Sequence, residues 1–138
     1  MLYYLDTNIL VFILSKQTDE IDSNVWNIIY DYSNIVRTSS VAIQELLLLY
    51  RIGKLRYRNY KSEKDILNEL ERVGVETVLF NKHHLNCYSS LQIVEGHKDM
   101  NDHAIIAQSI VDKIPVISSD SKFKEYTRQG LQFIYNKR

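Results

Sequence analysis

The fold is decided by the stretch Leu2-Tyr3-Tyr4-Leu5-Asp6-Thr7-Asn8, in which a short apolar run ends on an acid. An apolar run of this kind favours a buried β-strand. A carboxylate directly after such a strand lies at the carboxyl edge of a sheet, where open α/β folds build their binding sites. Burying an unpaired Asp6 there would be costly, so it needs a partner, and a cation is one candidate. The alternative is that Asp6 only caps the helix that follows it.

Length and composition favour one soluble domain over residues 1–138. The chain has a formal net charge of zero, which argues against a strongly cationic surface that coats long nucleic acid. Its single cysteine, Cys87, excludes an intrachain disulfide framework and fits a reducing compartment. The apolar segment 2–14 is interrupted by Asp6 and Asn8 and is too short to span a bilayer. We therefore expect a cytoplasmic protein that is not attached to a membrane.

Strand-like and helix-like segments alternate along the chain. Apolar and β-branched runs predict strands at residues 2–5, 35–36, 75–80, 115–118 and 131–135. Apolar periodicity and capping residues predict helices at residues 7–16, 22–33, 41–52, 63–73, 81–94, 102–111 and 122–128. Alternation of this kind favours a three-layer α/β/α sandwich with a mostly parallel central sheet.

Acids that are far apart in the sequence are predicted to meet at one edge of this sheet. Asp6 and Asp120 follow the first and fourth strands, and parallel strands point their carboxyl ends the same way. Asp102 begins the helix that leads into the fourth strand, and Glu45 lies about one turn into the helix after the second strand. Such a cluster needs a counter-charge, because like charges raise each other's pKa. Hard oxygen ligands suit Mg²⁺ or Mn²⁺, which can activate water and clamp phosphodiester oxygens.

Each acid also has an ordinary structural interpretation. Glu45 could be a solvated helix residue, although its neighbours Val41, Ala42 and residues 46–49 are apolar. Asp102 and Asp120 could each cap a helix, and Asp102 can do so while also binding a metal ion.

Four sequence blocks, taken in order, resemble PIN domains, and in particular the VapC-type toxins of toxin–antitoxin pairs. The blocks are Tyr4-Leu5-Asp6-Thr7-Asn8-Ile9-Leu10, Ser39-Ser40-Val41-Ala42-Ile43-Gln44-Glu45-Leu46, Asn101-Asp102-His103-Ala104-Ile105-Ile106-Ala107 and Val116-Ile117-Ser118-Ser119-Asp120-Ser121-Lys122-Phe123. Their order, their spacing and the total length agree with the family, so the resemblance covers nearly the whole chain.

The resemblance implies a Mg²⁺-dependent (or Mn²⁺-dependent) endoribonuclease that hydrolyses RNA phosphodiester bonds with a metal-activated water. It implies that Asp6, Glu45 and Asp102 are catalytic, metal-binding acids. Asp120 would be the fourth and more variable acid, helping with a second ion or a bridging water. It also implies a homodimer that a small antitoxin protein holds inactive.

Polar neighbours of these acids are expected to support them. Thr7, Asn8 and Ser118 would orient ligands or water from behind the metal-binding acids. Asp99 stands close to the third block, where many of these toxins carry a proline or an aromatic residue. Asp99 is therefore an alternative ligand, but the apolar helix that follows Asp102 is in the expected register and favours Asp102.

A basic and aromatic segment, residues 50–61, is a second functional candidate. Arg and Lys can hold phosphates and Tyr rings can stack on unpaired bases, so RNA or a partner protein would contact Lys54, Arg56, Tyr57 and Arg58. The alternative is a solvated turn between helices with tyrosines packed beneath it. His103 could also contact phosphate, although a surface position on its helix is the more common role for such a residue.

Two other functions are compatible with parts of this sequence. The first is a catalytically inert PIN-like module that binds RNA or protein without cutting. The second is a phosphatase of the haloacid-dehalogenase type, which also starts with an Asp at a strand end. That chemistry needs another Asp two residues later, where this chain has Asn8.

Overall fold

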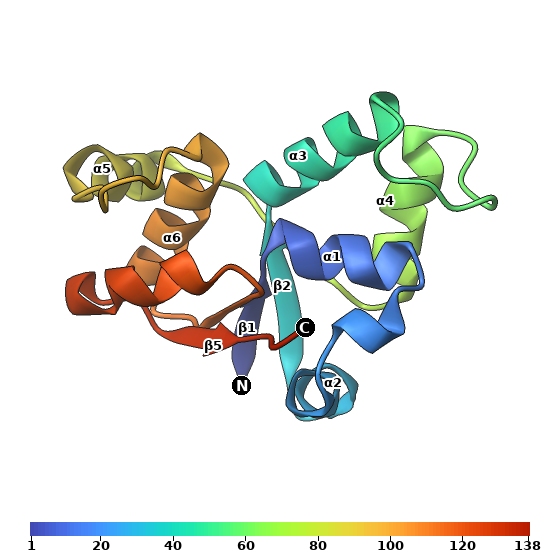
Figure 1. Cartoon of the computed structure of the whole chain (residues 1–138), viewed down its shortest axis with the longest axis horizontal. Coiled ribbons are helices and arrows are strands. Elements are labelled where there is room, and N and C mark those ends of the chain that lie inside the picture. The colour runs from blue at the N-terminus through green and yellow to red at the C-terminus, as the bar shows by residue number, and fades with distance from the viewer.

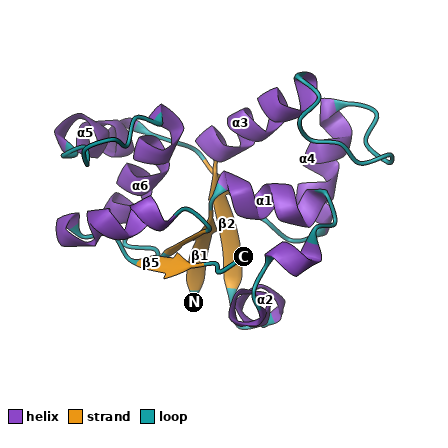
Figure 2. Cartoon of the chain, viewed as in Figure 1, coloured by secondary structure: helices purple, strands orange, loops and turns teal.

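Residues 1–138 are described by a computed structural model, and Figure 2 shows its helices and strands. The strands are β1 (Leu2–Leu5), β2 (Ile35–Ser39), β3 (Glu76–Val78), β4 (Val116–Ser118) and β5 (Phe133–Tyr135). The α-helices are α1 (Thr7–Leu14), α2 (Ser23–Tyr30), α3 (Ser40–Arg51), α4 (Glu63–Arg72), α5 (Lys82–Ser90) and α6 (Met100–Asp112). Two 3₁₀ helices complete the fold, η1 (Thr18–Glu20) and η2 (Ser121–Gln129).

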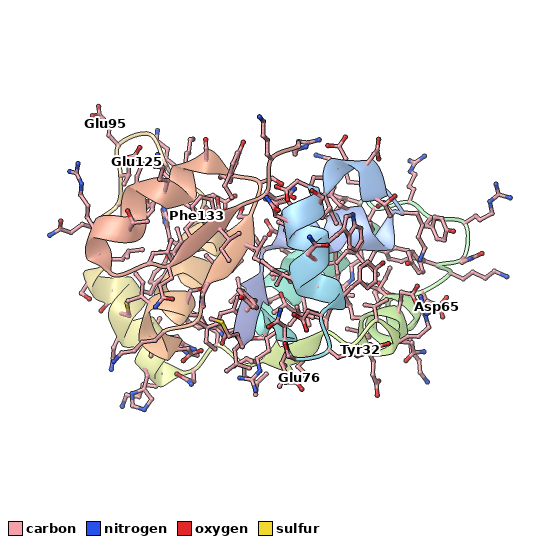
Figure 3. All side chains as sticks on the ribbon, turned by 90° about the horizontal axis from the view of Figure 1, so that it is seen from below. Tyr32, Asp65, Glu76, Glu95, Glu125 and Phe133 are labelled. Atoms are coloured by element: carbon pink, nitrogen blue, oxygen red, sulfur yellow. The ribbon has the colours of Figure 1, made fainter.

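The strands form one sheet in the order β3-β2-β1-β4-β5, and every neighbouring pair is parallel. Helices α5 and α6 lie on one side of β1 and β2, while α1, α3 and α4 lie on the other (Figure 1). Figure 3 shows Asp65 of α4 and Glu95, which precedes α6, at opposite ends of the molecule. The predicted three-layer sandwich is confirmed, with a sheet that is parallel throughout.

The first strand lies at the centre of the sheet, and there Tyr4 and Leu5 are buried because helices cover both faces. Leu5 of β1 pairs with Ile117 of β4, and both side chains are fully buried. Ile9 and Leu10 of α1 are also fully buried, so the turn at Asp6 is fixed on both sides by core packing. None of the helices is both long enough and apolar enough to cross a membrane.

Helix α6 begins two residues earlier than the sequence predicts. Asp99 is its N-cap, because Asp99 Oδ1 accepts hydrogen bonds from the backbone N–H groups of Asn101 (2.9 Å) and Asp102 (3.1 Å). The prediction that Asp102 begins this helix is therefore wrong, and Asp102 lies in the first turn. From the N-cap position, Asp99 can accept hydrogen bonds from the free N–H groups of the first turn, whereas Asp102 lies inside that turn.

Several further boundaries differ from the prediction. Helix α1 ends at Leu14 rather than residue 16 and α2 ends at Tyr30 rather than residue 33, whereas β2 runs on to Ser39 and β3 and β5 are shorter than predicted.

Helix α5 ends at Ser90 rather than near residue 94, because the backbone of Gln92 pairs with the side-chain amide of Gln129 at 2.9 and 2.8 Å. The short helix predicted at residues 122–128 is confirmed as the 3₁₀ helix η2, and Gly130 ends it with a positive φ of 101°.

Candidate active site

Asp6 lies at the carboxyl end of β1 with only 2% of its surface exposed. Its backbone N–H donates to the carbonyl of Ile117 at 3.0 Å, which extends the β1–β4 pairing to this residue. Oδ1 accepts a hydrogen bond from the Thr7 N–H at 2.7 Å, so Asp6 does cap α1. Oδ2 accepts from the Ser118 hydroxyl at 2.6 Å. The cap therefore uses one oxygen, and the other points across the sheet edge to β4.

Asn8 and Ser118 tie the two strand ends together. Asn8 Nδ2 donates to Asp6 Oδ2 and to Ser118 Oγ, each at 3.2 Å, and Asn8 Oδ1 accepts from the Ser119 N–H at 3.2 Å. Ser118 Oγ also accepts from the Asp120 N–H at 3.0 Å. These contacts place the backbone of Asp120 next to Asp6, although more than a hundred residues separate them in the chain.

A cavity of about 360 Å³ opens at this edge of the sheet, and its wall contains five carboxylates. The lining residues are Asp6, Thr7, Asn8, Val11, Phe12, Glu45, Leu49, Asp99, Asp102, Asp120 and Arg138. The structure thus brings Asp6, Glu45, Asp102 and Asp120 to one place. Ser118, which is fully buried, lies behind this wall.

Glu45 and Asp102 reach the cavity from opposite layers of the sandwich. Glu45 is only partly exposed, and its Oε2 accepts a hydrogen bond from Asn101 Nδ2 at 3.3 Å, which joins α3 to α6. Ligand atoms of Asp102, Asp120 and His97 lie within 4.8 Å of one another. Asp120 also caps η2, because its Oδ1 accepts a hydrogen bond from the Lys122 N–H at 2.9 Å. The same side chain therefore caps a helix and lines the acidic cavity.

Two carboxylates of this wall, Asp6 and Asp102, resist ionisation. Burial raises the pKa of Asp6 to about 7, and the charge of Asp102 adds to the shift. Burial likewise raises the pKa of Asp102 to about 8, with contributions from Asp99, Asp120 and Glu45. Without a cation, Asp6 and Asp102 each keep a proton at pH values well above their ordinary pKa of 3.8. A divalent ion would supply the positive charge that the cluster lacks.

Thr7 Oγ1 is the one buried side-chain oxygen or nitrogen without a hydrogen-bond partner in the protein. Thr7 is 6% exposed and lines the acidic cavity. An unpaired buried hydroxyl is unfavourable, and a water or ligand in the neighbouring cavity could supply its partner. This orphaned oxygen, together with a wall of hard oxygen donors, fits a hydrated Mg²⁺ or Mn²⁺.

Arg138 is the single cationic residue in the cavity wall, and the sequence prediction missed it. Its Nε donates to Glu20 Oε2 at 2.7 Å, and its guanidinium lies 5.0 Å from the centre of the Phe12 ring. No ion pair joins it to an acid of the cavity. Because Nε is the group engaged by Glu20, the terminal Nη groups are free to bind an anion.

His97 is the second missed residue, since nothing in the sequence distinguishes it five positions before Asp102. It is 2% exposed, and its Nε2 lies 3.0 Å from Asp102 Oδ2. His103, predicted to contact phosphate or lie at the surface, is instead 6% exposed and bonds the His97 carbonyl at 2.9 Å. Burial lowers the pKa values of both histidines.

The basic segment forms a separate cavity of about 860 Å³ between α3 and α4, whose lining residues include Arg56, Tyr57 and Arg58 but not Lys54. It shares no lining residue with the acidic cavity. Both cavities include a residue of α3, since Leu49 lines the acidic cavity and Tyr50 lines the basic one.

Some groups of this segment are already engaged within the protein. Arg56 Nε donates to the Gly53 carbonyl at 2.7 Å, and Tyr50 Oη donates to the Tyr60 carbonyl at 3.2 Å. Arg58 and Lys54 are exposed.

The family model of the PIN domain matches residues 3–129 of this sequence. With the fold and the acidic cavity described above, this match identifies the chain as a member of the PIN domain family. A comparison with curated proteins found no match.

Solved structures share the fold. The chain is similar to one in a crystal structure of VapBC2 from Rickettsia felis bound to promoter DNA, with 21% identity, a TM-score of 0.68 and 99% of each chain covered. It is similar to a chain of VapBC-1 from nontypeable Haemophilus influenzae, with 17% identity, a TM-score of 0.64 and 98% of each chain covered. For VapBC-5 from Mycobacterium tuberculosis, described as a toxin–antitoxin system, the identity is 21%, the TM-score 0.61 and the coverage 97% of this chain and 98% of that one.

Proposed function

We propose that the protein is a divalent-metal-dependent endoribonuclease and the toxin of a toxin–antitoxin pair. The observation that carries the proposal is the convergence of Asp6, Glu45, Asp102 and Asp120 on one cavity from four separate segments. PIN domains as a family are generally nucleases, and the structural neighbours belong to VapBC complexes. We propose one domain over residues 1–138 that acts in the cytoplasm as a homodimer.

Asp6, Glu45 and Asp102 would hold a Mg²⁺ or Mn²⁺ ion, with Asp120 completing the acidic wall. The raised pKa values of Asp6 and Asp102 support this assignment, because a cation would release the protons that these acids otherwise keep. When bound, the ion supplies a Lewis acid that lowers the pKa of a water molecule and neutralises phosphate oxygens. Thr7 Oγ1 would pair with a water or with a phosphate oxygen inside the cavity.

The other residues of the wall would orient the reacting groups. Ser118 and Asn8 hold Asp6 Oδ2 in a fixed direction through hydrogen bonds of 2.6 and 3.2 Å. Arg138, held by Glu20 and by the Phe12 ring, would bind a non-bridging phosphate oxygen through its free Nη groups. A cation beside the acids would keep a phosphodiester from being repelled by the negative wall.

RNA is proposed as the substrate because an exposed cationic and aromatic segment follows α3, the helix that carries Glu45. Arg58 and Lys54 are exposed and available for phosphates, and Tyr57 lines the basic cavity, where it could stack on a base. The partner would be a small antitoxin, by analogy with the two-component VapBC complexes that the fold resembles.

Asp6→Asn tests the proposal, because it keeps the shape of the side chain and removes its charge. We expect RNA cleavage in Mg²⁺ buffer to fall by a hundredfold or more while the circular dichroism spectrum stays unchanged. Asp19→Asn is the matched control, since Asp19 is exposed and outside the cavity. Undiminished cleavage by Asp6→Asn would reject the assignment, and absence of cleavage and of Mn²⁺ binding in the wild-type protein would favour an inert binding module.

A further inference from the structure

A chain of buried hydrogen bonds runs from η2 to the acidic cavity through His97. The hydroxyl of Tyr126 lies 2.7 Å from His97 Nδ1, and His97 Nε2 lies 3.0 Å from Asp102 Oδ2. Tyr126 is fully buried and His97 is 2% exposed, so solvent does not compete for either ring. None of these contacts is needed to explain how the cavity is built.

The proton positions in this chain follow from the partners of Tyr126. Its hydroxyl oxygen accepts a hydrogen bond from the Val94 N–H at 3.1 Å. Its own proton therefore needs an acceptor, and His97 Nδ1 is the acceptor within reach. A neutral imidazole that accepts at Nδ1 carries its proton on Nε2. His97 must then donate Nε2–H to Asp102.

We propose that His97 is a positioning residue for Asp102: fixed by Tyr126 as the Nε2–H tautomer, it occupies Asp102 Oδ2 and leaves Oδ1 to bind the divalent cation. This inference rests on the proposed function, because it concerns the same metal site. It assigns His97 to the hydrogen-bond network around the metal ion rather than to direct ligation. Hydrogen bonds of this kind orient ligating side chains and tune metal affinity.

Direct ligation by His97 is the competing arrangement, since its ring nitrogen lies within 4.8 Å of oxygens of Asp102 and Asp120. Ligation would require a free lone pair on Nε2 and a proton on Nδ1. That proton would then point at the Tyr126 oxygen, and the buried Tyr126 hydroxyl would lose its acceptor. The cost of an unpaired buried hydroxyl favours the donor arrangement.

His103 holds His97 from the other side. Its Nε2 lies 2.9 Å from the His97 carbonyl, and the two rings meet edge to face with their centres 4.7 Å apart. The His97 ring is therefore restrained through its backbone, its face and both of its nitrogens. A ring held in this way can transmit its orientation to Asp102.

The chain also provides a matched control. His84 is 1% exposed, its Nδ1 accepts from the Asn81 N–H at 3.0 Å, and its Nε2 lies 2.9 Å from Asp112 Oδ1. The arrangement is the same as that of His97, but neither His84 nor Asp112 lines the acidic cavity. His84→Gln therefore perturbs a buried His–Asp pair without touching the metal site.

The first test is long-range ¹H–¹⁵N NMR of the histidine rings in the metal-free wild-type protein. We expect His97 Nε2 to carry a proton and Nδ1 to carry none, and we expect Tyr126→Phe to weaken this preference. Finding the proton on Nδ1 of His97 overturns the inference. This readout does not depend on activity, on metal binding or on a variant of His97.

The second test is calorimetric titration with Mn²⁺. We expect His97→Leu to weaken Mn²⁺ binding by about tenfold or more, as found for groups that orient metal ligands. His97→Gln, which retains an N–H donor, should recover part of this loss, and His84→Gln should bind as the wild type does. Unchanged binding by folded His97→Leu overturns this inference alone, whereas absence of Mn²⁺ binding in the wild type overturns the proposed function as well.

Discussion

Ser118 donates a hydrogen bond of 2.6 Å to Asp6, although 112 residues separate the two in the chain. The same hydroxyl accepts from the Asp120 N–H and from Asn8 Nδ2, so one small side chain contacts three polar groups of the cavity. This is possible because β1 and β4 are adjacent parallel strands that end at the same level. The orientation of the most deeply buried acid therefore depends on the fourth strand.

Ser118→Ala should weaken Mn²⁺ binding about tenfold, because Asp6 Oδ2 loses its shortest hydrogen bond and its fixed direction. Calorimetry would measure the change. Ser109→Ala is the control, since Ser109 is also buried but bonds only within α6, to the Ile105 carbonyl. Equal affinities for Ser118→Ala and the wild type would contradict the role given to Ser118.

The stability of the metal-free protein should fall as the pH rises from about 6.5 to about 8. Below this window the lowered pKa values of the buried His97 and His103 act in the opposite direction. The folded state holds protons on Asp6 and Asp102 up to pKa values of about 7 and about 8, whereas both acids have an ordinary value of 3.8. In this window the unfolded chain binds fewer protons than the folded one, so the free energy of unfolding decreases with pH. Urea denaturation in EDTA across this range would measure the slope.

The same experiment on Asp6→Asn should give a flatter dependence, because one of the titrating groups is gone. Asp19→Asn should keep the slope of the wild type, since the exposed Asp19 lies outside the cavity. A wild-type stability that rises over this pH range would contradict the account of the acidic wall.

Addition of Mn²⁺ at neutral pH should stabilise the protein against heat. An ion that binds only the folded state adds about 2.7 kcal/mol at a concentration one hundred times its Kd. Differential scanning calorimetry should show a higher Tm that EDTA reverses, and Asp102→Asn should remove most of the shift. A Tm that Mn²⁺ leaves unchanged in the wild type would be inconsistent with a metal site.

Arg138→Gln should lower kcat/KM for RNA by roughly tenfold or more, the loss expected for one charge-assisted hydrogen bond to phosphate. Mn²⁺ affinity should not fall, because Arg138 makes no ion pair with the acids. Arg128→Gln serves as the control, since Arg128 is exposed and does not line the cavity. Steady-state cleavage of a defined RNA would measure kcat/KM for both variants. An equal loss for Arg138→Gln and Arg128→Gln would indicate a nonspecific effect of charge and would contradict the role given to Arg138.

Local sequence signals were sufficient to predict the alternation of strands and helices, the mostly parallel sheet and the meeting of the acids, but not the order of the strands in the sheet. An apolar run that ends on Asp6 favours a buried strand with a polar edge, and alternation with helices favours parallel neighbours. The parallel arrangement alone places Asp6 and Asp120 at one edge. The capping alternatives were also correct for Asp6 and Asp120, because one carboxylate can cap a helix and face a cavity at once.

The errors have two causes: a choice between two neighbouring caps, and contacts between residues that are distant in the sequence. Asp99 and Asp102 are equally good caps in sequence, and only the register of α6 assigns the cap to Asp99. His97 carries no local signal, because its position depends on contacts with Tyr126 and Asp102. Arg138 carries none either, because Glu20 and the Phe12 ring hold it in the cavity wall.

The most direct test of the central claim is anomalous diffraction from crystals of the wild-type protein grown with Mn²⁺. The account predicts an anomalous peak inside the acidic cavity, within ligand distance of Asp6 and Asp102 oxygens, that is absent in Asp6→Asn crystals. A cavity without a peak at saturating Mn²⁺, or a peak bound only to residues outside that wall, would contradict it.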